Sequence, residues 1–166
     1  MSSNLPTTTY SGWETLMTRF FRLCLLASMC FVLLTPISAS AATPEWTYET
    51  AVLTYTNANR TDRDLHALKI NACVDRYAER QARRMRDARK LYHQKLSPIM
   101  TNCGLKSAGE NIAYGYSSGR SVVNAWMRSS GHRANILKSS YRLMGVGAVR
   151  DSRGVWWVSQ VFGTAK

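Results

Sequence analysis

Acidic residues, histidines and local catalytic signatures are all scarce in this chain. Its 166 residues include 10 Asp and Glu against 22 Lys and Arg, and only 3 His. No Cys-x-x-Cys is present, which excludes the usual dithiol redox motif. No His-Glu-x-x-His is present, so a zinc site would have to join residues that lie far apart in the sequence. The absence of an internal repeat excludes a solenoid.

The N-terminal part has the order of charges and apolar residues that is typical of a signal peptide. Arg19 and Arg22 precede an apolar run at residues 23–37, and Ala39-Ser40-Ala41 follows as a small-residue cleavage signal. The run is short for a permanent membrane span, although an uncleaved anchor is the alternative. The sequence therefore predicts a signal peptide at residues 1–41 and a mature domain at residues 42–166 without a transmembrane span. The protein is expected to be secreted, or associated with the cell envelope.

Positive charge dominates the chain, whose formal net charge is +12. A basic exported protein is attracted to anionic surfaces such as acidic lipids and envelope polymers. The simpler alternative is that the charge only keeps the protein soluble. No specific nucleic-acid partner is indicated.

Two of the four cysteines lie in the predicted signal peptide, and the mature domain keeps Cys73 and Cys103. In an oxidising compartment these two are expected to form a disulfide. The bond would close a long loop and stabilise the fold by about 3–4 kcal/mol. Two free thiols are the alternative.

Hydrophobic periodicity predicts most of the secondary structure. Residues 66–90 carry the clearest helical pattern, with apolar side chains on one arc and Arg76, Arg80 and Arg84 on the opposite arc. This basic arc is either a solvated face or an anion-binding strip. The predicted elements are helices at 43–59, 66–90, 119–129 and 131–137, a connecting loop at 91–109, and strands at 111–116, 146–149 and 155–162.

The last two strands are predicted to form a hairpin, because a polar turn at residues 151–154 separates them. Residues 156–162 are apolar on both faces, which favours a central strand that is covered on both sides. Trp126, Trp156 and Trp157 are expected in the core, and the two adjacent tryptophans should point to opposite faces. The pattern predicts an α+β fold with helices packed on both faces of an antiparallel sheet.

One carboxylate and two imidazoles are the candidates for chemistry. Glu110 stands in the apolar stretch 109–113, where a charged group needs a partner. Together with His93 and His132 it could bind a divalent cation such as zinc, or activate a water molecule without metal. Alternatively, Glu110 and His132 only hydrogen-bond each other and fasten a strand to a helix. Asn135 shares the helical face of His132 and is expected to cap or to make a buried hydrogen bond.

Several ordered motifs resemble a known family. They are Gly109-Glu110-Asn111-Ile112-Ala113, Val122-Val123-x-Ala125-Trp126-Met127, Gly131-His132-Arg133-Ala134-Asn135-Ile136-Leu137, Gly145-Val146-Gly147 and Trp157-Val158-x-Gln160-Val161-Phe162-Gly163. The sequence is similar to the bacterial branch of the CAP superfamily, which is named for cysteine-rich secretory proteins, antigen 5 and pathogenesis-related proteins. The resemblance extends from about Trp46 to Gly163, and it implies a three-layer α-β-α sandwich with a central antiparallel sheet.

The resemblance also implies a cavity with two histidines and two glutamates, which in some members bind a divalent metal. His93, Glu110 and His132 match three of these positions, whereas Ser129 stands where the second glutamate is usual. Water would have to complete the shell of a metal held by three ligands. The sequence therefore predicts a ligand-binding cleft at His93, Glu110, His132 and Asn135, with zinc as the candidate cofactor at the first three.

Members of the family differ in activity, so the fold does not fix the function. The first hypothesis is a secreted CAP-domain protein that binds a ligand or a divalent metal in the His/Glu cleft and associates with envelope or host surfaces. Its ligand is unknown, with a lipid or an envelope polymer as the candidates. The alternatives are a metal-assisted hydrolase with Glu110 as base, and an extracellular lipid or sterol carrier. The serine at position 129 favours binding over catalysis.

Overall fold

The computed structural model describes residues 43–166 of the protein. The helices are α2 (Pro44–Thr61), α3 (Ala72–Ala88), α4 (Ser97–Asn102), α5 (Gly119–Arg128) and α6 (Ser130–Ile136), and the strands are β1 (Lys69–Ile70), β2 (Leu105–Tyr114), β3 (Leu143–Arg150) and β4 (Trp156–Ala165). The signal peptide that the sequence predicts at residues 1–41 lies outside the described residues. Among the residues described, no helix has the length and apolar character needed to cross a membrane.

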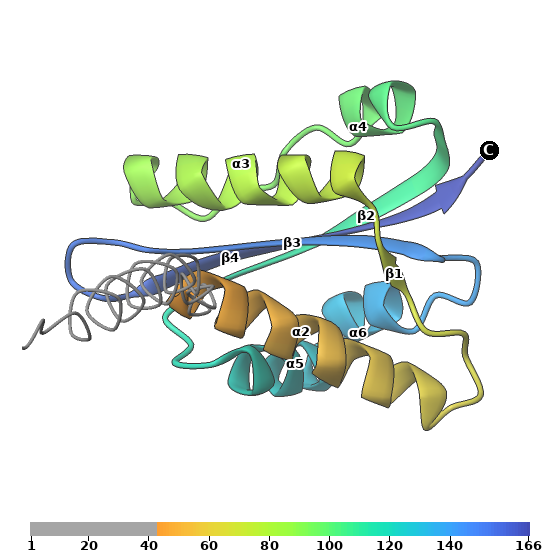
Figure 1. The fold of residues 1–166 in the computed structure, drawn as a ribbon, viewed down its shortest axis with the longest axis horizontal. Helices are drawn as coiled ribbons and strands as arrows, with labels where there is room; N and C mark the ends of the chain where they lie inside the picture. The colour runs from red at the N-terminus through yellow and green to blue at the C-terminus, as the bar shows by residue number, and fades with distance from the viewer. Residues whose placement is uncertain (1–42) are drawn as a thin grey trace, which may run out of the picture. The chain divides into compact units, whose positions relative to one another are not determined.

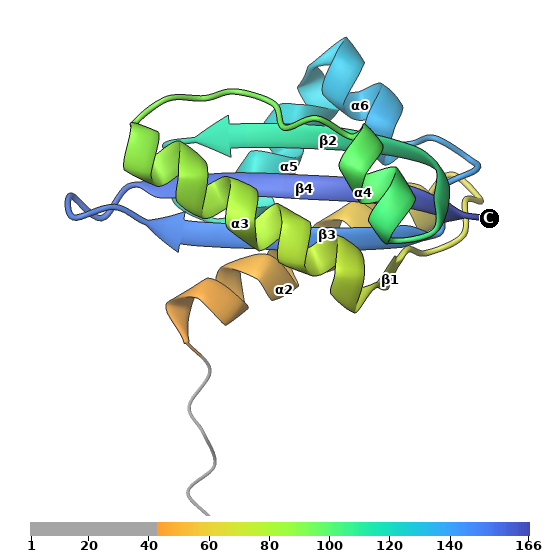
Figure 2. The same ribbon diagram turned by 90° about the horizontal axis from the view of Figure 1, so that it is seen from above.

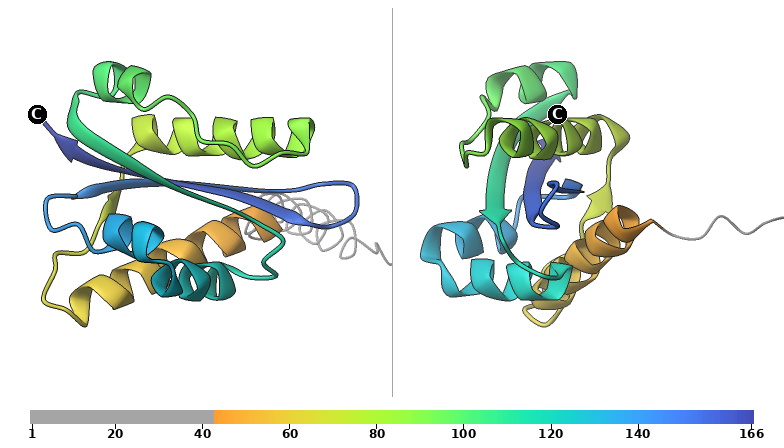
Figure 3. Two further views of the ribbon diagram at one scale, coloured as in Figure 1. Left: turned by 180° about the vertical axis from the view of Figure 1, so that it is seen from behind. Right: turned by 90° about the vertical axis from the view of Figure 1, so that its left-hand side faces the viewer.

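A four-stranded sheet in the order β1-β3-β4-β2 forms the middle layer. Helices α3 and α4 lie on one face of it, and α2, α5 and α6 lie on the other (Figure 1 and Figure 3). Strand β4 pairs antiparallel with both β2 and β3, while the two-residue β1 adds a short parallel pairing to β3. The predicted α+β three-layer sandwich is confirmed.

The central strand β4 supplies side chains to both halves of the core, as its two-sided apolar pattern predicts. Phe162 belongs to the cluster formed with α2, α5 and α6, whereas Val161 packs in the cluster formed with α3 and α4. Trp156 contacts Tyr48 of α2, with 4.5 Å between ring centroids, and Trp157 lies in the cluster with Met85 of α3. The two tryptophans therefore point to opposite faces, as expected.

The structure differs from the sequence-based prediction at two boundaries. Helix α3 begins at Ala72 rather than near residue 66, because the Asn71 side chain accepts hydrogen bonds from the backbone N–H groups of Cys73 and Val74 and so satisfies the free donors of the first turn. The predicted loop at 91–109 contains α4 and the first half of β2. Helix α4 has six residues, which is too short to show a helical period.

Helix α3 lies unusually close to β3 because that strand presents glycine to it. A Cβ atom on Gly145 or Gly147 would collide with the α3 backbone at Asp75 and Glu79. The free edge of β3 is also protected, since Asp75 Oδ1 accepts from Val146 N–H and Glu49 Oε1 from Ala148 N–H, both at 2.9 Å. Burial raises the pKa of Glu49 to about 7. The charges of nearby acidic groups raise this pKa further, whereas the hydrogen bond from Ala148 lowers it.

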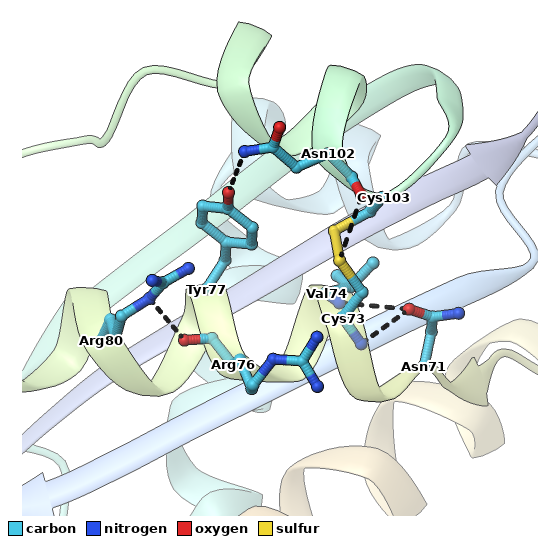
Figure 4. The surroundings of a disulfide bond; sticks show 8 residues. All are labelled: Asn71, Cys73, Val74, Arg76, Tyr77, Arg80, Asn102 and Cys103. Atoms are coloured by element: carbon cyan, nitrogen blue, oxygen red, sulfur yellow. Dashed lines mark hydrogen bonds between the residues drawn. A yellow bond between two sulfur atoms is a disulfide. The ribbon is translucent and has the colours of Figure 1, made fainter.

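The predicted disulfide is present between Cys73 in the first turn of α3 and Cys103 just after α4 (Figure 4). It joins two segments that are 30 residues apart. Because the chain between them forms α3, the following loop and α4, the bond fixes both ends of this excursion. The other half of α4 is anchored by Ile99, which is fully buried.

Arg60 is fully buried at the end of α2 and joins the layer formed by α2, α5 and α6. Its Nε donates to the carbonyl of His66 at 2.8 Å. Its two terminal nitrogens donate to the carbonyls of Ile136, Lys138 and Tyr141 at 2.7, 3.0 and 3.1 Å. Burial lowers the pKa of Arg60, and the charge of Arg142 lowers it further. This side chain thus supplies a donor to the Ile136 carbonyl at the end of α6 and adds a second donor to the carbonyls of Lys138 and Tyr141.

We predict that Arg60→Ala lowers the free energy of unfolding by about 3–5 kcal/mol, because it removes a fully buried side chain with four hydrogen bonds and leaves the buried Ile136 carbonyl without that donor. Urea unfolding followed by tryptophan fluorescence measures the change. Arg63→Ala is the matched control, since Arg63 is exposed and donates to the Asn59 carbonyl alone; it should change stability by less than about 0.5 kcal/mol. Equal effects of the two substitutions would contradict this role of Arg60.

Candidate functional site

The candidate site lies along the edge of the sheet formed by β2. This strand pairs with β4 on one side only, and the segment after α3 and helix α6 both lie beside its outer edge (Figure 2). Successive side chains of a strand point to opposite faces. Glu110 pairs in register with Val161, which packs against α3, and Asn111 pairs with Gln160 on the face that carries α6. Glu110 therefore lies on the face of the sheet that carries α3, and its neighbour Asn111 lies on the face that carries α6.

The carboxylate of Glu110 is buried and accepts four hydrogen bonds from the protein. Its side chain is 2% exposed. Oε2 accepts from His93 Nδ1 at 2.8 Å and from the backbone N–H of Gln94 at 3.2 Å. Oε1 accepts from Gln94 Nε2 at 2.8 Å and from Ser159 Oγ at 3.0 Å. A carboxylate offers about four lone-pair positions, so these contacts use the acceptor capacity of Glu110 fully.

His93 brings an imidazole from the loop after α3 to this carboxylate. Since an ionised carboxylate only accepts, Nδ1 donates to Glu110 and the tautomer of the neutral ring is fixed. Nε2 is then free to accept a hydrogen bond, or to donate when the ring is protonated. The side chain is 56% exposed, so Nε2 is accessible to a ligand. Glu110 orients the ring in the same way that a carboxylate orients a metal-binding histidine.

Asn111 organises the opposite face of the strand. Its Nδ2 donates to the carbonyl of His132 at 3.2 Å and to Gln160 Oε1 at 3.3 Å, and its Oδ1 accepts from Asn135 Nδ2 at 3.0 Å. Asn135 also donates to the backbone carbonyl of Glu110 at 3.1 Å. Gln160 Nε2 continues the chain to Thr56 Oγ1 of α2 at 2.8 Å. Asn135 thus makes two half-buried hydrogen bonds, which hold α6 against β2.

His132 belongs to α6 and lies near the site, but it makes no hydrogen bond to Glu110 among the described residues. Its ring is half-buried, and its centroid lies 6.4 Å from that of Trp126. Burial lowers the pKa of His132, and the charge of nearby His93 lowers it further. The two imidazoles thus influence each other across the β2 edge, while only His93 contacts the carboxylate directly. The alternative, a direct hydrogen bond between Glu110 and His132, is wrong: within residues 43–166 the Glu110 carboxylate bonds to His93, Gln94 and Ser159 instead.

Four partners of the site are not evident from the sequence patterns: Gln94, Asn111, Ser159 and Gln160. Gln94 follows a candidate histidine, and Ser159 and Gln160 are the polar residues of an otherwise apolar strand. A polar pair inside a central strand has to find buried partners. That mismatch was a usable signal, but it does not say which strand lies opposite.

A metal does not fit the geometry of the three predicted ligands. No group of three or more His, Cys, Asp or Glu that could hold a metal occurs within residues 43–166. Both oxygens of Glu110 are already engaged by the protein, and Ser129 ends α5 without an acidic side chain. Zinc at His93, Glu110 and His132 therefore stays a prediction without support from this arrangement.

One pattern was missed from the sequence alone: the spacing Gly-x-Ser-x-Gly occurs at residues 115–119, in the turn between β2 and α5. In hydrolases this pattern presents a nucleophilic serine. The central serine here is Ser117, and its neighbour Ser118 caps α5 by accepting from the backbone N–H of Ser121. Ser117 and Ser118 line a cavity of about 350 Å³ whose described lining contains no His, Asp or Glu. A serine without an adjacent base is not activated, so this turn shows no triad.

Most of the described chain is similar in sequence to known proteins. A sequence model of the cysteine-rich secretory protein family (CAP) matches residues 53–162. The uncharacterized protein YkwD of Bacillus subtilis is 37% identical over 136 residues, which cover 78% of this chain and 52% of YkwD. The chain thus spans about half the length of that relative.

Solved structures resemble the fold as well. An extracellular protein containing an SCP domain from Bacillus anthracis has a TM-score of 0.66 at 25% identity, covering 72% of this chain and 41% of that one. An outer surface protein of Borrelia burgdorferi has a TM-score of 0.65 at 19% identity, covering 70% and 92%. A structure of NaASP2 with Zn2+ has a TM-score of 0.56 at 13% identity, covering 77% and 84%, and shows the fold alone.

We predict that Glu110→Gln lowers the free energy of unfolding by about 2–4 kcal/mol, because the new amide NH₂ replaces an acceptor and faces donors. Ser159→Ala, which removes one donor, should lower it by about 1–2 kcal/mol. Glu79→Gln is the control, because the Glu79 carboxylate is 38% exposed and pairs with Arg83 at the surface; its loss should stay below about 1 kcal/mol. Urea denaturation measures all three, and a neutral Glu110→Gln would contradict the network.

We predict that His93→Ala raises the pKa of His132, because it removes a like charge that disfavours the protonated ring. Burial remains in the variant, so the pKa should stay below the ordinary value of histidine. NMR titration of the imidazole Hε1 signal measures the shift, with His66→Ala as the control that leaves it unchanged. An unchanged His132 titration in His93→Ala would show that the two rings do not share the edge of β2.

Proposed function

Because the chain belongs to the cysteine-rich secretory protein (CAP) family, we propose that it is an exported binding protein. Its ligand contacts the outer edge of β2 through His93 and His132, which approach that edge from opposite layers. The predicted signal peptide and the extracellular nature of the similar Bacillus anthracis protein support export. Family membership itself does not decide between binding and hydrolysis.

The hydrogen bonds of Glu110 are the observation that favours binding over hydrolysis. A general base needs a lone pair within hydrogen-bond distance of a water molecule. Both oxygens of Glu110 are instead bonded to His93, Gln94 and Ser159, and the side chain is buried. Its role is to hold the loop after α3 and to orient the His93 ring.

The two histidines provide the polar contacts of the proposed cleft. His93 exposes Nε2, which accepts from a ligand hydroxyl or amide when the ring is neutral. The lowered pKa of His132 keeps that ring neutral near pH 7, so it also acts as donor and acceptor rather than as a cation. Trp126 lies beside His132 but is itself buried in the core. The groups offered to a ligand are therefore the two imidazoles, which suit a polar ligand.

We expect the wild-type protein to hydrolyse neither a panel of peptides nor a panel of p-nitrophenyl esters above the rate of the buffer. Glu110→Gln should give the same rates, since its carboxylate has no catalytic role. Adding zinc to the wild type and to His132→Ala tests the metal-assisted alternative in the same assay. Hydrolysis by the wild type that Glu110→Gln abolishes, with the fold intact by circular dichroism, would overturn the proposal.

A second experiment tests binding directly. Immobilised wild-type protein and the double variant His93→Ala/His132→Ala are exposed to a delipidated polymer fraction and to a lipid extract of bacterial envelopes. Mass spectrometry then identifies what each column retains. We expect a polymer component that only the wild type retains. Selective retention of lipid would favour the carrier alternative, and equal retention by both columns would contradict a cleft at these histidines.

A further inference from the structure

A groove of about 630 Å³ lies between α3 and the segment that follows this helix. One wall comes from α3, where the lining residues have the spacing i, i+3, i+4, i+7 that places them on one helical face; they are Tyr77, Arg80, Gln81 and Arg84. The other wall is residues 92–95 together with Pro98 of α4. His93 lines this groove and also contacts Glu110 in the site described above.

The groove is strongly basic. Arg80, Arg84 and Lys95 line it, and among residues 43–166 none of the three forms a salt bridge. The described lining contains no Asp or Glu. By contrast, the nearby Arg83 and Arg86 are paired with Glu79 and Asp87. Cations that are gathered in a concave surface without counter-charges attract anions more strongly than the same cations spread over a flat face.

The wall formed by α3 is held in place before any ligand arrives (Figure 4). Asn102 Nδ2 donates to the Tyr77 hydroxyl at 2.6 Å, and the Arg80 guanidinium lies 4.3 Å from the centre of the Tyr77 ring. Arg80 Nε donates to the carbonyl of Arg76 at 3.2 Å. The terminal nitrogens of Arg80 have no hydrogen-bond acceptor among the described residues. An oriented guanidinium of this kind loses little conformational entropy when it binds an oxyanion.

The opposite wall is fixed by hydrogen bonds across the groove floor. Gln81 is fully buried, and its Nε2 donates to the carbonyl of Tyr92 at 2.5 Å. Gln94 is held by Glu110 through both its backbone and its side chain. Gln81 Oε1 is the buried side-chain polar atom that lacks a partner within residues 43–166. The floor is thus closed by the protein itself, and the cations of the two walls are the groups that face a ligand.

We propose that this groove binds the phosphate groups of a soluble, chain-like polyanion. Two arginines and a lysine on facing walls suit tetrahedral oxyanions, which guanidinium groups bind through paired hydrogen bonds. A flat anionic bilayer would instead meet the outer arc of α3, where the exposed Arg76 and Arg83 lie, and would not reach the floor of the groove. The geometry therefore favours a polymer over a membrane.

This inference names the chemistry of a ligand for the proposed binding function, but it uses residues outside the His93–Glu110–His132 site. A failure to bind phosphate would overturn the proposed phosphate site in the groove, but it would not change the result of the hydrolysis assay. Hydrolysis that depends on Glu110 would overturn the proposed function and leave the groove intact.

The test compares two double variants that remove the same charge. Arg84→Ala/Lys95→Ala removes one arginine and one lysine from the groove, and Arg76→Ala/Lys90→Ala removes the same pair of residue types from positions outside it. Isothermal titration with sodium tripolyphosphate in about 0.15 M NaCl, where long-range attraction is screened, measures the dissociation constants. We expect about tenfold or more weaker binding for the groove variant, and about twofold or less for the control.

Equal weakening by the two variants would show diffuse attraction and overturn the proposal, as would a wild type that shows no heat of binding at millimolar probe. Oligoglutamate of matched charge should bind more weakly than tripolyphosphate, and equal affinity would contradict phosphate recognition. Vesicles of phosphatidylglycerol provide the membrane arm. Groove-dependent binding of vesicles without binding of tripolyphosphate would assign the site to a membrane instead. None of the four substituted residues is buried, and circular dichroism checks that the variants fold.

Discussion

The arrangement of the site depends on one constraint: two adjacent polar residues of an edge strand must find partners on opposite faces of the sheet. Glu110 points toward α3 and collects His93, Gln94 and Ser159, whereas Asn111 points toward α6 and collects Asn135 and the carbonyl of His132. Buried polar groups are costly when unpaired. The alternation of β2 therefore brings the loop after α3 and helix α6 to the same edge, although these segments belong to different layers.

Acidic side chains and unpaired cations lie at different places in the fold. At the β3 edge, Glu49 and Asp75 accept from the N–H groups of Ala148 and Val146 and protect a strand that β1 covers for two residues only. Burial raises the pKa of both carboxyls, and the backbone hydrogen bonds that they accept oppose this rise. The unpaired cations of α3 and the following loop gather at the β2 edge instead. The groove beside α3 thus gathers three cations without counter-charges next to His93.

The sequence predicted the layers, the central strand and the disulfide because these depend on patterns that are local or compartment-dependent. The two-sided apolar run at 156–162 indicates a covered strand, and two cysteines in an exported domain indicate one bond. It grouped His93 with Glu110, but it predicted neither α4 nor the contacts of Glu110 with Gln94 and Ser159. Six residues are too few to show a helical period, and the pairing of Glu110 with Ser159 and Gln94 depends on strand register, which the sequence of a single strand does not contain. Arg60 appeared as an ordinary polar residue at a helix end, because only the packed structure brings the carbonyls of 136, 138 and 141 around it.

The segment after α3 can serve as a binding wall because it is held at several points despite its irregular backbone. The Cys73–Cys103 bond closes the excursion, Gln81 holds Tyr92, and Glu110 holds His93 and Gln94. A loop that is ordered before binding avoids most of the entropy loss that ligand binding would otherwise require. The exposed side chains of Lys95 and His93 are then presented from a rigid frame, while the carboxylate that positions them stays out of reach of the ligand. Glu110 therefore positions the residues of this segment through its hydrogen bonds.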